Sequence, residues 1–292
     1  MSETKIEWTD TTWNPVRGCS IVSAGCTNCY AMKQAHRFSG PGGPYEGLTT
    51  VTRGGPVWTG DVRIVPELLD APLRWRKPRR VFVNSMSDLF HDAIPDTFID
   101  RVFAVMAMSD QHRFQILTKR PERMQRYLTS RGDRPLANVW LGVSIENQAT
   151  ADERIPLLLQ TLAAVRFVSC EPLLGPIELP AHDQSMGQSY SPLDWVIVGG
   201  ESGPGARPCD VRWIRSVVGH CKATRVPVFV KQLGAKYQDA HNGIAGSHYR
   251  YDRPTQMQIH NREIGALMYL RSRKGGDPSE WPADLRVREF PK

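Results

Sequence analysis

Six short hydrophobic runs recur along the chain, and polar or glycine residues follow each of them directly. They are RRVFVNSMSD (79–88), HRFQILTKR (112–120), NVWLGVSIE (138–146), VRFVSCEPL (165–173), DWVIVGGESG (194–203) and VPVFVKQLG (226–234). Continuous runs of Val, Ile, Phe, Leu and Trp at this length are typical of strands buried on both faces, as in parallel sheets. The sequence therefore predicts at least six strands of a parallel sheet.

Stretches with helical character lie between these runs, at residues 95–109, 120–131, 149–165 and 211–224. Pro95 suits the first turn of the first helix, whereas Pro156 inside the third predicts a late start or a kink. Repeated alternation of strand and helix favours an α/β fold with a parallel (β/α) barrel, full or partial.

The last part of the chain has a different composition. We expect residues 1–235 to form the barrel, with a cysteine loop near its start, and residues 236–292 to form an irregular C-terminal extension that packs on the barrel. One short helix is expected around Glu263–Arg271. Near the other end, residues 41–56 (PGGPYEGLTTVTRGGP) predict a mobile loop that covers the site or touches a substrate.

Polar side chains follow every predicted strand, and the carboxyl ends of parallel strands are where such folds place their sites. These residues are Ser85 and Asp88, Lys119 and Arg120, Ser144 and Glu146, Cys170 and Glu171, Gly200 and Glu201, and Lys231. Their register predicts one shared pocket. The alternative for each of the four acids is an ion pair with a neighbouring Lys or Arg.

Three of the six cysteines are close together near the N-terminus. Cys19, Cys26 and Cys29 have the spacing C-x6-C-x2-C. Three thiolates can hold an iron–sulfur cluster with one open iron, or a zinc ion whose fourth ligand would be His36. Three thiols without metal are the remaining reading. Cys209 and Cys221 fit buried structural positions, while Cys170 ends a predicted strand that faces the pocket.

Composition and charge narrow the setting and the partners. The chain has 292 residues, is 40% hydrophobic and 23% charged, and carries a net charge of +7 with a sequence pI of about 9.2. A basic surplus favours polyanionic partners such as nucleic acid. The N-terminus has no apolar signal-like region and no run is long enough to span a membrane, so we expect a cytoplasmic protein without membrane contact. Disulfides are not expected there.

Two segments around the cysteines carry a family resemblance. Asn14-Pro15-Val16-Arg17-Gly18-Cys19 and Cys26-Thr27-Asn28-Cys29-Tyr30-Ala31 resemble the motif of radical S-adenosylmethionine (radical SAM) proteins of the spore-photoproduct-lyase-like group. That group has a first spacing of C-x3-C, which is shorter than here, and an aromatic residue where this chain has Asn28. Residues 116–119 (ILTK) resemble an I-x-T-K strand end of the same group.

The whole chain also resembles a phage-associated three-Cys-motif family of unassigned function. The resemblance lies in residues 6–15, 144–146, 170–173, 199–203 and 231–234. Together the two resemblances imply an enzyme in which Cys19, Cys26 and Cys29 hold a [4Fe–4S] cluster. Its open iron would bind S-adenosylmethionine, and reductive cleavage would yield a 5′-deoxyadenosyl radical that acts on a substrate.

The resemblance assigns roles to the strand-end residues as well. Acidic side chains suit the ammonium group and ribose diol of S-adenosylmethionine, and basic side chains suit its carboxylate. The candidate cofactor-binding residues are Ser85, Asp88, Ser144, Glu146, Glu171, Gly200, Glu201 and Lys231, and the catalytic candidates are Lys119 and Cys170. We expect a nucleic acid or nucleotide substrate, for modification or repair, together with an electron donor; a partner protein is a further candidate. A zinc-containing nucleic-acid-binding protein without catalysis is the alternative, and an iron–sulfur electron carrier is a third reading.

Overall fold

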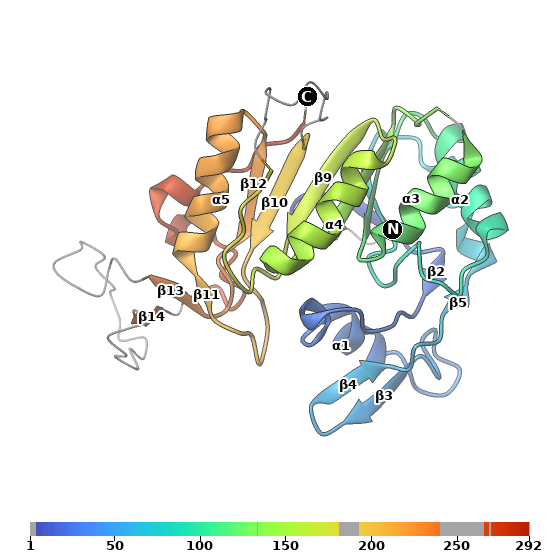
Figure 1. The fold of residues 1–292 in the computed structure, drawn as a ribbon. Coiled ribbons are helices and arrows are strands. Elements are labelled where there is room, and N and C mark those ends of the chain that lie inside the picture. The colour runs from blue at the N-terminus through green and yellow to red at the C-terminus, as the bar shows by residue number, and fades with distance from the viewer. Residues whose placement is uncertain (1–3, 133, 181–192, 240–265, 269, 292) are drawn as a thin grey trace. The chain divides into compact units, whose positions relative to one another are not determined.

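A computed structural model describes residues 4–132, 134–180, 193–239, 266–268 and 270–291. Seven parallel strands form its main sheet, in the order β1-β6-β7-β8-β9-β10-β12 (Figure 1). They are β1 (Thr11–Trp13), β6 (Arg80–Val83), β7 (Arg113–Thr118), β8 (Val139–Ser144), β9 (Val165–Cys170), β10 (Trp195–Gly199) and β12 (Val228–Gln232). The sheet ends at β1 and β12, so the barrel expected from the sequence is a partial one.

Helices alternate with the strands, as the pattern predicts. They are α1 (Tyr30–His36), α2 (Asp96–Met108), α3 (Pro121–Arg131), α4 (Gln148–Gln160) and α5 (Val211–Thr224). All six predicted strands and all four predicted helices are confirmed. Helix α4 contains Pro156 and begins at Gln148, so the late start is wrong. Strand β1 was not predicted, because three residues with two threonines make no hydrophobic run.

The chain divides into two compact units. Unit 1 is Met1–Ser144 with Arg154–Phe167, and unit 2 is Ile145–Glu153 with Val168–Lys292. Strands β6, β7 and β8 belong to unit 1 and their register is parallel throughout. A Cβ atom on Gly142 of β8 would lie 2.5 Å from the Phe167 ring, so the aromatic side chain occupies the space that the glycine leaves.

Unit 1 has a small lobe outside the main sheet, which we call the hairpin lobe and define as residues 30–64. It contains α1 and the antiparallel hairpin of β3 (Thr49–Thr52) and β4 (Gly55–Trp58), and it ends in β5 (Arg63–Ile64), which pairs with β2 (Val16–Arg17). The loop expected over residues 41–56 is therefore wrong for its second half. Gly55 has a φ of +109°, which a side chain rarely adopts, and so it lets the hairpin turn.

The C-terminal residues of unit 2 return to the main sheet. Val230 of β12 donates its N–H to the Val287 carbonyl, and Trp281 is fully buried. Nearby, β11 (Cys209–Asp210), β13 (Tyr237–Asp239) and β14 (Ala266–Met268) form a three-stranded sheet. The helix expected around residues 263–271 is wrong at 266–268, and its first residues lie outside the described part. The boundary at residue 235 stays a prediction. Among the described helices, none has the length and apolarity needed to cross a membrane.

Candidate functional site

The three clustered cysteines follow one another through a short loop in unit 1. Cys19 comes after Gly18, whose φ is +87° and whose missing Cβ would lie 2.3 Å from the Asp61 carbonyl oxygen. Cys26 ends a turn of 3-10 helix, and Cys29 is the N-cap of α1. Local backbone geometry thus fixes where the loop begins and where it ends.

Electrostatic interactions between the thiols contribute to their pKa values. The pKa of Cys19 is raised to about 12, chiefly by burial, with the Asp88 carboxylate and Cys29 adding to the rise and the Arg120 guanidinium opposing it. Burial also raises the pKa of Cys29, and Cys26 adds to the rise. The backbone N–H groups of the first turn of α1 work in the other direction on Cys29. These three side chains therefore share one neighbourhood, in which burial favours the protonated thiols while the Arg120 guanidinium and the N–H groups of α1 partly oppose it.

Whether these thiols fit a metal group depends on donor chemistry and on geometry. Three cysteine thiols are the donor set that an iron–sulfur cluster uses. Within the described residues, however, no three His, Cys, Asp or Glu side chains converge in a metal-holding arrangement. The donors therefore fit the cluster by type and neighbourhood, and binding would bring the sulfurs closer than they are here.

Asp88 is tied into the loop after β7. Its carboxylate accepts hydrogen bonds from the Thr118 hydroxyl at 2.7 Å, the Lys119 backbone N–H at 3.1 Å and Arg120 Nη1 at 3.0 Å. The side chains of Asp88 and Arg120 are only 7% and 10% exposed. Asp88 thus fixes the end of one strand against the end of another, and the ion-pair alternative describes it.

Arg120 extends this network to the cysteine loop. Its Nη2 donates to Ser20 Oγ at 2.6 Å, and the same hydroxyl lies 2.9 Å from Nε2 of His91. Ser20 directly follows Cys19, so Arg120 connects the cysteine loop to Asp88. Lys119 is half-buried and its positive charge lowers the pKa of Cys29. The basic strand end after β7 therefore lies beside two of the three cysteines.

The loop after β6 is held by Asn14. The Asn14 side-chain oxygen accepts from the Ser85 hydroxyl at 3.1 Å and from the Met86 backbone N–H at 3.2 Å. Tyr30, the residue after Cys29, donates its hydroxyl to the Ser85 carbonyl at 2.6 Å. Ser85 is thus brought to the cysteine loop, with its own hydroxyl already committed to Asn14.

Asn84 is a residue of this site that the sequence analysis missed. It is 2% exposed and neither atom of its side-chain amide has a hydrogen-bond partner among the described residues. Its φ is +58°, in the left-handed region. A buried amide with a free donor and a free acceptor fits a ligand that offers both groups side by side. Its position directly after the apolar run RVFV was the signal available in the sequence.

The remaining predicted residue of unit 1 is Ser144, at the end of β8. Its side chain is buried and its carbonyl accepts from Arg154 Nη1 at 2.7 Å. Unit 1 therefore brings Ser85, Asp88 and Lys119 into the network of the cysteine loop. The contacts described for Ser144 are with Arg154, which belongs to α4.

Unit 2 holds the other predicted strand ends, and two of its acids form ion pairs. Lys231 Nζ lies 2.7 Å from Glu171 Oε1, and the Gln232 amide donates to the same oxygen at 3.1 Å. Glu201 accepts two hydrogen bonds from the Arg207 guanidinium, at 2.5 and 3.0 Å. Lys231 and Glu171, both expected to bind the cofactor, thus neutralise each other, and Arg207, which was not a predicted ligand, neutralises Glu201.

Three further predicted residues of unit 2 are deeply buried. Glu146 is fully buried after β8. A Cβ on Gly200 would lie 2.3 Å from the Leu233 carbonyl oxygen, so close backbone packing accounts for this glycine. Cys170 is fully buried, and burial, with Cys221 adding to it, raises its thiol pKa. An inaccessible, protonated thiol makes Cys170 a poor nucleophile.

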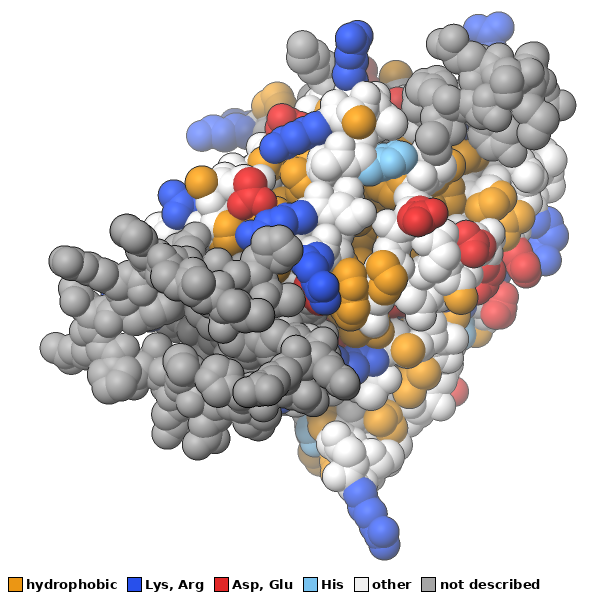
Figure 2. Space-filling model, turned by 60° about the vertical axis from the view of Figure 1, so that its left-hand side comes forward, with side chains coloured by type: hydrophobic (Ala, Val, Ile, Leu, Met, Phe, Trp, Pro, Cys, Tyr) orange, Lys and Arg blue, Asp and Glu red, His pale blue; other side chains and the backbone are white. Residues whose placement is uncertain are grey.

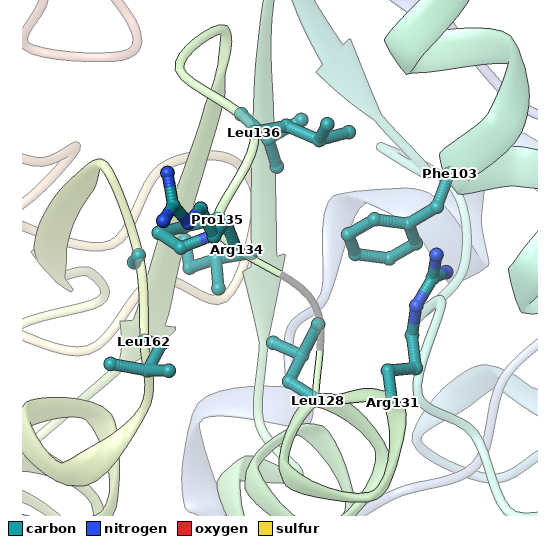
Figure 3. A pocket seen from close by; sticks show the side chains of 10 residues that line it. Phe103, Leu128, Arg131, Arg134, Pro135, Leu136 and Leu162 are labelled. Carbon is teal, nitrogen blue, oxygen red and sulfur yellow. The ribbon is translucent and has the colours of Figure 1, made fainter.

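A separate, shallow pocket opens to solvent elsewhere in unit 1 (Figure 3). Its walls include Phe103, Leu128, Leu136 and Leu162 with two arginines at 131 and 134. It lies at the amino end of β8, since Val139 begins that strand. No predicted site residue lines it, so it is not the expected strand-end pocket.

Comparisons with known proteins add a family and one structural likeness. The family model described as "Protein of unknown function (DUF5131)" matches residues 3–272. No curated protein matches the chain. The fold is similar to that of a cysteine-to-serine mutant of spore photoproduct lyase, with a TM-score of 0.43 and 12% identity over 92% of this chain and 71% of that one. A similarity this weak carries no functional argument, and the phage association stays a prediction.

Proposed function

The chain belongs to the DUF5131 family of proteins of unknown function, and we propose that it is a radical SAM-type enzyme. In this proposal Cys19, Cys26 and Cys29 hold a [4Fe–4S] cluster. When bound, the cluster and S-adenosylmethionine supply one-electron cleavage and hydrogen abstraction. An electron donor is therefore required. The substrate is a nucleic acid or nucleotide.

One observation carries the proposal: the three thiols share one neighbourhood that the strand ends reinforce. Cys29 contributes to the raised pKa of Cys19, and Cys26 contributes to the raised pKa of Cys29. Arg120 and Lys119 bring positive charge to two of them. Burial keeps Cys19 and Cys29 protonated, so a bound metal would have to displace their protons, and the positive charge and helix N–H groups reduce the cost of that step. Hydrogen bonds and charge near the sulfurs also tune the potential of a cluster.

This chain's own residues have distinct tasks in the proposal. Asn14 and Tyr30 hold the loop after β6 beside the cysteines. Asn84 offers a buried donor and acceptor to a bound ligand. The positive charge of Lys119 would neutralise a carboxylate of the cofactor or a phosphate of the substrate. Cys170 has no access to a substrate and is left out of the proposed chemistry.

The zinc alternative requires His36 as a fourth ligand. His36 Nδ1 already lies 3.2 Å from the Thr49 hydroxyl and 3.3 Å from the Ser39 hydroxyl, which connects the ring to the hairpin. A ring oriented by these contacts is explained by the packing of the hairpin lobe alone. We therefore favour the cluster, and the substitution His36→Gln separates the two readings.

The test begins with protein purified without oxygen and analysed for iron, sulfide and zinc. We expect about four irons per chain in the wild type, loss of iron in each of Cys19→Ala, Cys26→Ala and Cys29→Ala, and full iron in His36→Gln. Dithionite and S-adenosylmethionine should then yield 5′-deoxyadenosine. Zinc without iron, or iron that survives loss of any one of the three cysteines, would refute the proposal. An intact cluster without that product would leave an electron carrier.

A further inference from the structure

Exposed hydrophobic side chains concentrate on one part of unit 1. Five of the eight large hydrophobic side chains that are exposed in the described residues lie between Cys19 and Trp58. They are Ile21, Val22, Tyr30, Phe38 and Val51, with exposed fractions of 41% to 65%. Two of them are aromatic: Tyr30 is the first residue of α1, and Phe38 lies two residues beyond its end. Clusters of this kind mark binding surfaces.

The same segment is basic. The hairpin lobe carries Lys33, Arg37, Arg53 and Arg63 against only Glu46 and Asp61. Arg63 donates to the Glu46 carbonyl and so helps to hold the lobe together. Arg37 and Arg53 are exposed, and neither has an ion pair among the described residues. In Figure 2 the lowest part of the visible face, where the hairpin lies in Figure 1, shows apolar and basic side chains without acidic ones.

A small hydrophobic core, to which Met86 of the loop after β6 also contributes, supports the lobe. Ala31, Met32, Tyr45 and Trp58 are buried together, and the rings of Tyr45 and Trp58 lie 6.5 Å apart. The hairpin is in full register from Thr49↔Trp58 to Thr52↔Gly55. Arg53 therefore lies in the turn of a supported hairpin, where its side chain is exposed.

The lobe is continuous with the cysteine loop. Helix α1 begins at the residue after Cys29, and Cys19 and Cys29 both pack against the core of the lobe. A ligand bound by Tyr30 and Phe38 would therefore lie close to the three thiols.

We propose that the hairpin lobe binds single-stranded nucleic acid. Exposed aromatic rings stack on unpaired bases, and scattered arginines balance the phosphates between them. A duplex would hide its base faces and would be met by a longer basic stripe. This inference locates the substrate of the proposed function. The reaction on the strand rests on the proposed function, whereas binding of the strand does not.

Fluorescence anisotropy of the full-length protein with a labelled single-stranded oligonucleotide tests this, with the matching duplex measured in parallel. Phe38→Ala should weaken single-strand binding about tenfold without changing the salt slope. The double variant Arg37→Gln with Arg53→Gln should weaken binding at low salt. It should also flatten the slope of log K against log salt by about 1.4, because each phosphate contact of a single strand contributes about 0.7.

Matched controls lie outside the lobe. Arg126→Gln removes an exposed arginine of α3, and Met108→Ala removes an exposed hydrophobic side chain of α2; both should bind within about twofold of wild type. Circular dichroism verifies the fold of each variant. Absence of binding at low salt, equal losses of affinity in the lobe and control variants, or duplex affinity equal to the single-strand affinity would overturn the inference.

The measurement is made on metal-free and iron-loaded protein. Because binding is read without turnover, single-strand affinity that depends on the lobe would stand even if no 5′-deoxyadenosine were formed. In that case the proposed reaction would fail and the binding site would remain. Conversely, an active cluster with no affinity for the strand would refute the lobe's role and leave the reaction in place.

Discussion

The buried pair of Asp88 and Arg120 leads to the sharpest prediction about stability. The substitution Asp88→Asn keeps the shape of the side chain and removes its charge, which leaves the Arg120 guanidinium buried without its counter-ion. The matched control is Asp96→Asn, because Asp96 forms an ion pair of similar length with Arg123, 2.9 Å against 3.0 Å. The two acids differ in burial.

The expected magnitudes follow from that difference. Asp88 is 7% exposed and its partner 10%, whereas Asp96 is 62% exposed. Removing one partner of a buried pair costs about 3–5 kcal/mol. An asparagine retains part of the hydrogen bonding with Thr118 and Lys119, so we take about 3 kcal/mol for Asp88→Asn. A surface pair contributes about 1 kcal/mol or less.

Thermal unfolding of the metal-free protein, followed by circular dichroism, measures the difference. At about 2–4 °C per kcal/mol for a unit of this size, Asp88→Asn should lower the midpoint by about 6–12 °C. The control should lower it by at most about 4 °C. Added salt should shrink the effect of the control further, because exposed charges are screened and buried ones are not.

Two results would refute this reasoning. Equal losses in Asp88→Asn and Asp96→Asn would mean that burial does not decide the strength of these pairs. A midpoint for Asp88→Asn within the range of the control would mean that water or a neighbouring group replaces the carboxylate at no cost.

Three further predictions follow from single side chains. Asn84→Gly removes the strain of a left-handed backbone conformation and two unsatisfied polar atoms, so the free energy of unfolding should rise by about 0.5–1 kcal/mol. The same variant should bind S-adenosylmethionine more weakly in equilibrium dialysis, and unchanged binding would exclude Asn84 as a ligand contact. Burial lowers the pKa of His112, so this histidine takes up a proton at a higher pH in the unfolded state than in the folded state. Stability should therefore fall as pH drops below about 6.5. In His112→Asn the midpoint of thermal unfolding should change less between pH 7.5 and pH 5.5, and the same change as in the wild type would contradict this. Gly142→Ala places a methyl group against the Phe167 ring and should lower the free energy of unfolding by about 1–3 kcal/mol. Gly219→Ala in α5 adds a methyl group that meets nothing within 4 Å, and it should raise the free energy of unfolding by about 0.5–1 kcal/mol. Equal unfolding midpoints in the two variants would contradict this difference in packing.

The strands that the sequence predicts best are those buried on both faces. The runs that became β8 and β10 are uniformly hydrophobic, and every residue of these strands is buried. β1 lacks that signal because it lies at the edge of the sheet and contains Thr11 and Thr12. The hairpin was mistaken for a loop because Gly54, Gly55 and the nearby prolines look like loop composition, whereas Gly55 serves a tight turn.

The candidate site was predictable in its positions and not in its pairings. Strand order and the rule on carboxyl ends place Asp88 and Glu171 correctly at strand ends. Which of them would be ion-paired depends on side-chain directions that no spacing encodes, and Arg207, the partner of Glu201, lies in a segment with no hydrophobic pattern. Asn84 follows the apolar run RVFV directly, but a pattern of polar and apolar residues does not encode its left-handed backbone conformation or the lack of partners for its amide.

The way the two compact units alternate along the chain has a consequence for synthesis on the ribosome. Unit 1 needs residues 154–167, which are made only after the nine residues 145–153 that belong to unit 2. At about 5–20 residues per second, unit 1 waits about one to five seconds after Ser144 for its last segment. A fragment ending at Ser144 would therefore correspond to no complete unit, and a nascent chain paused there would expose hydrophobic surface to chaperones.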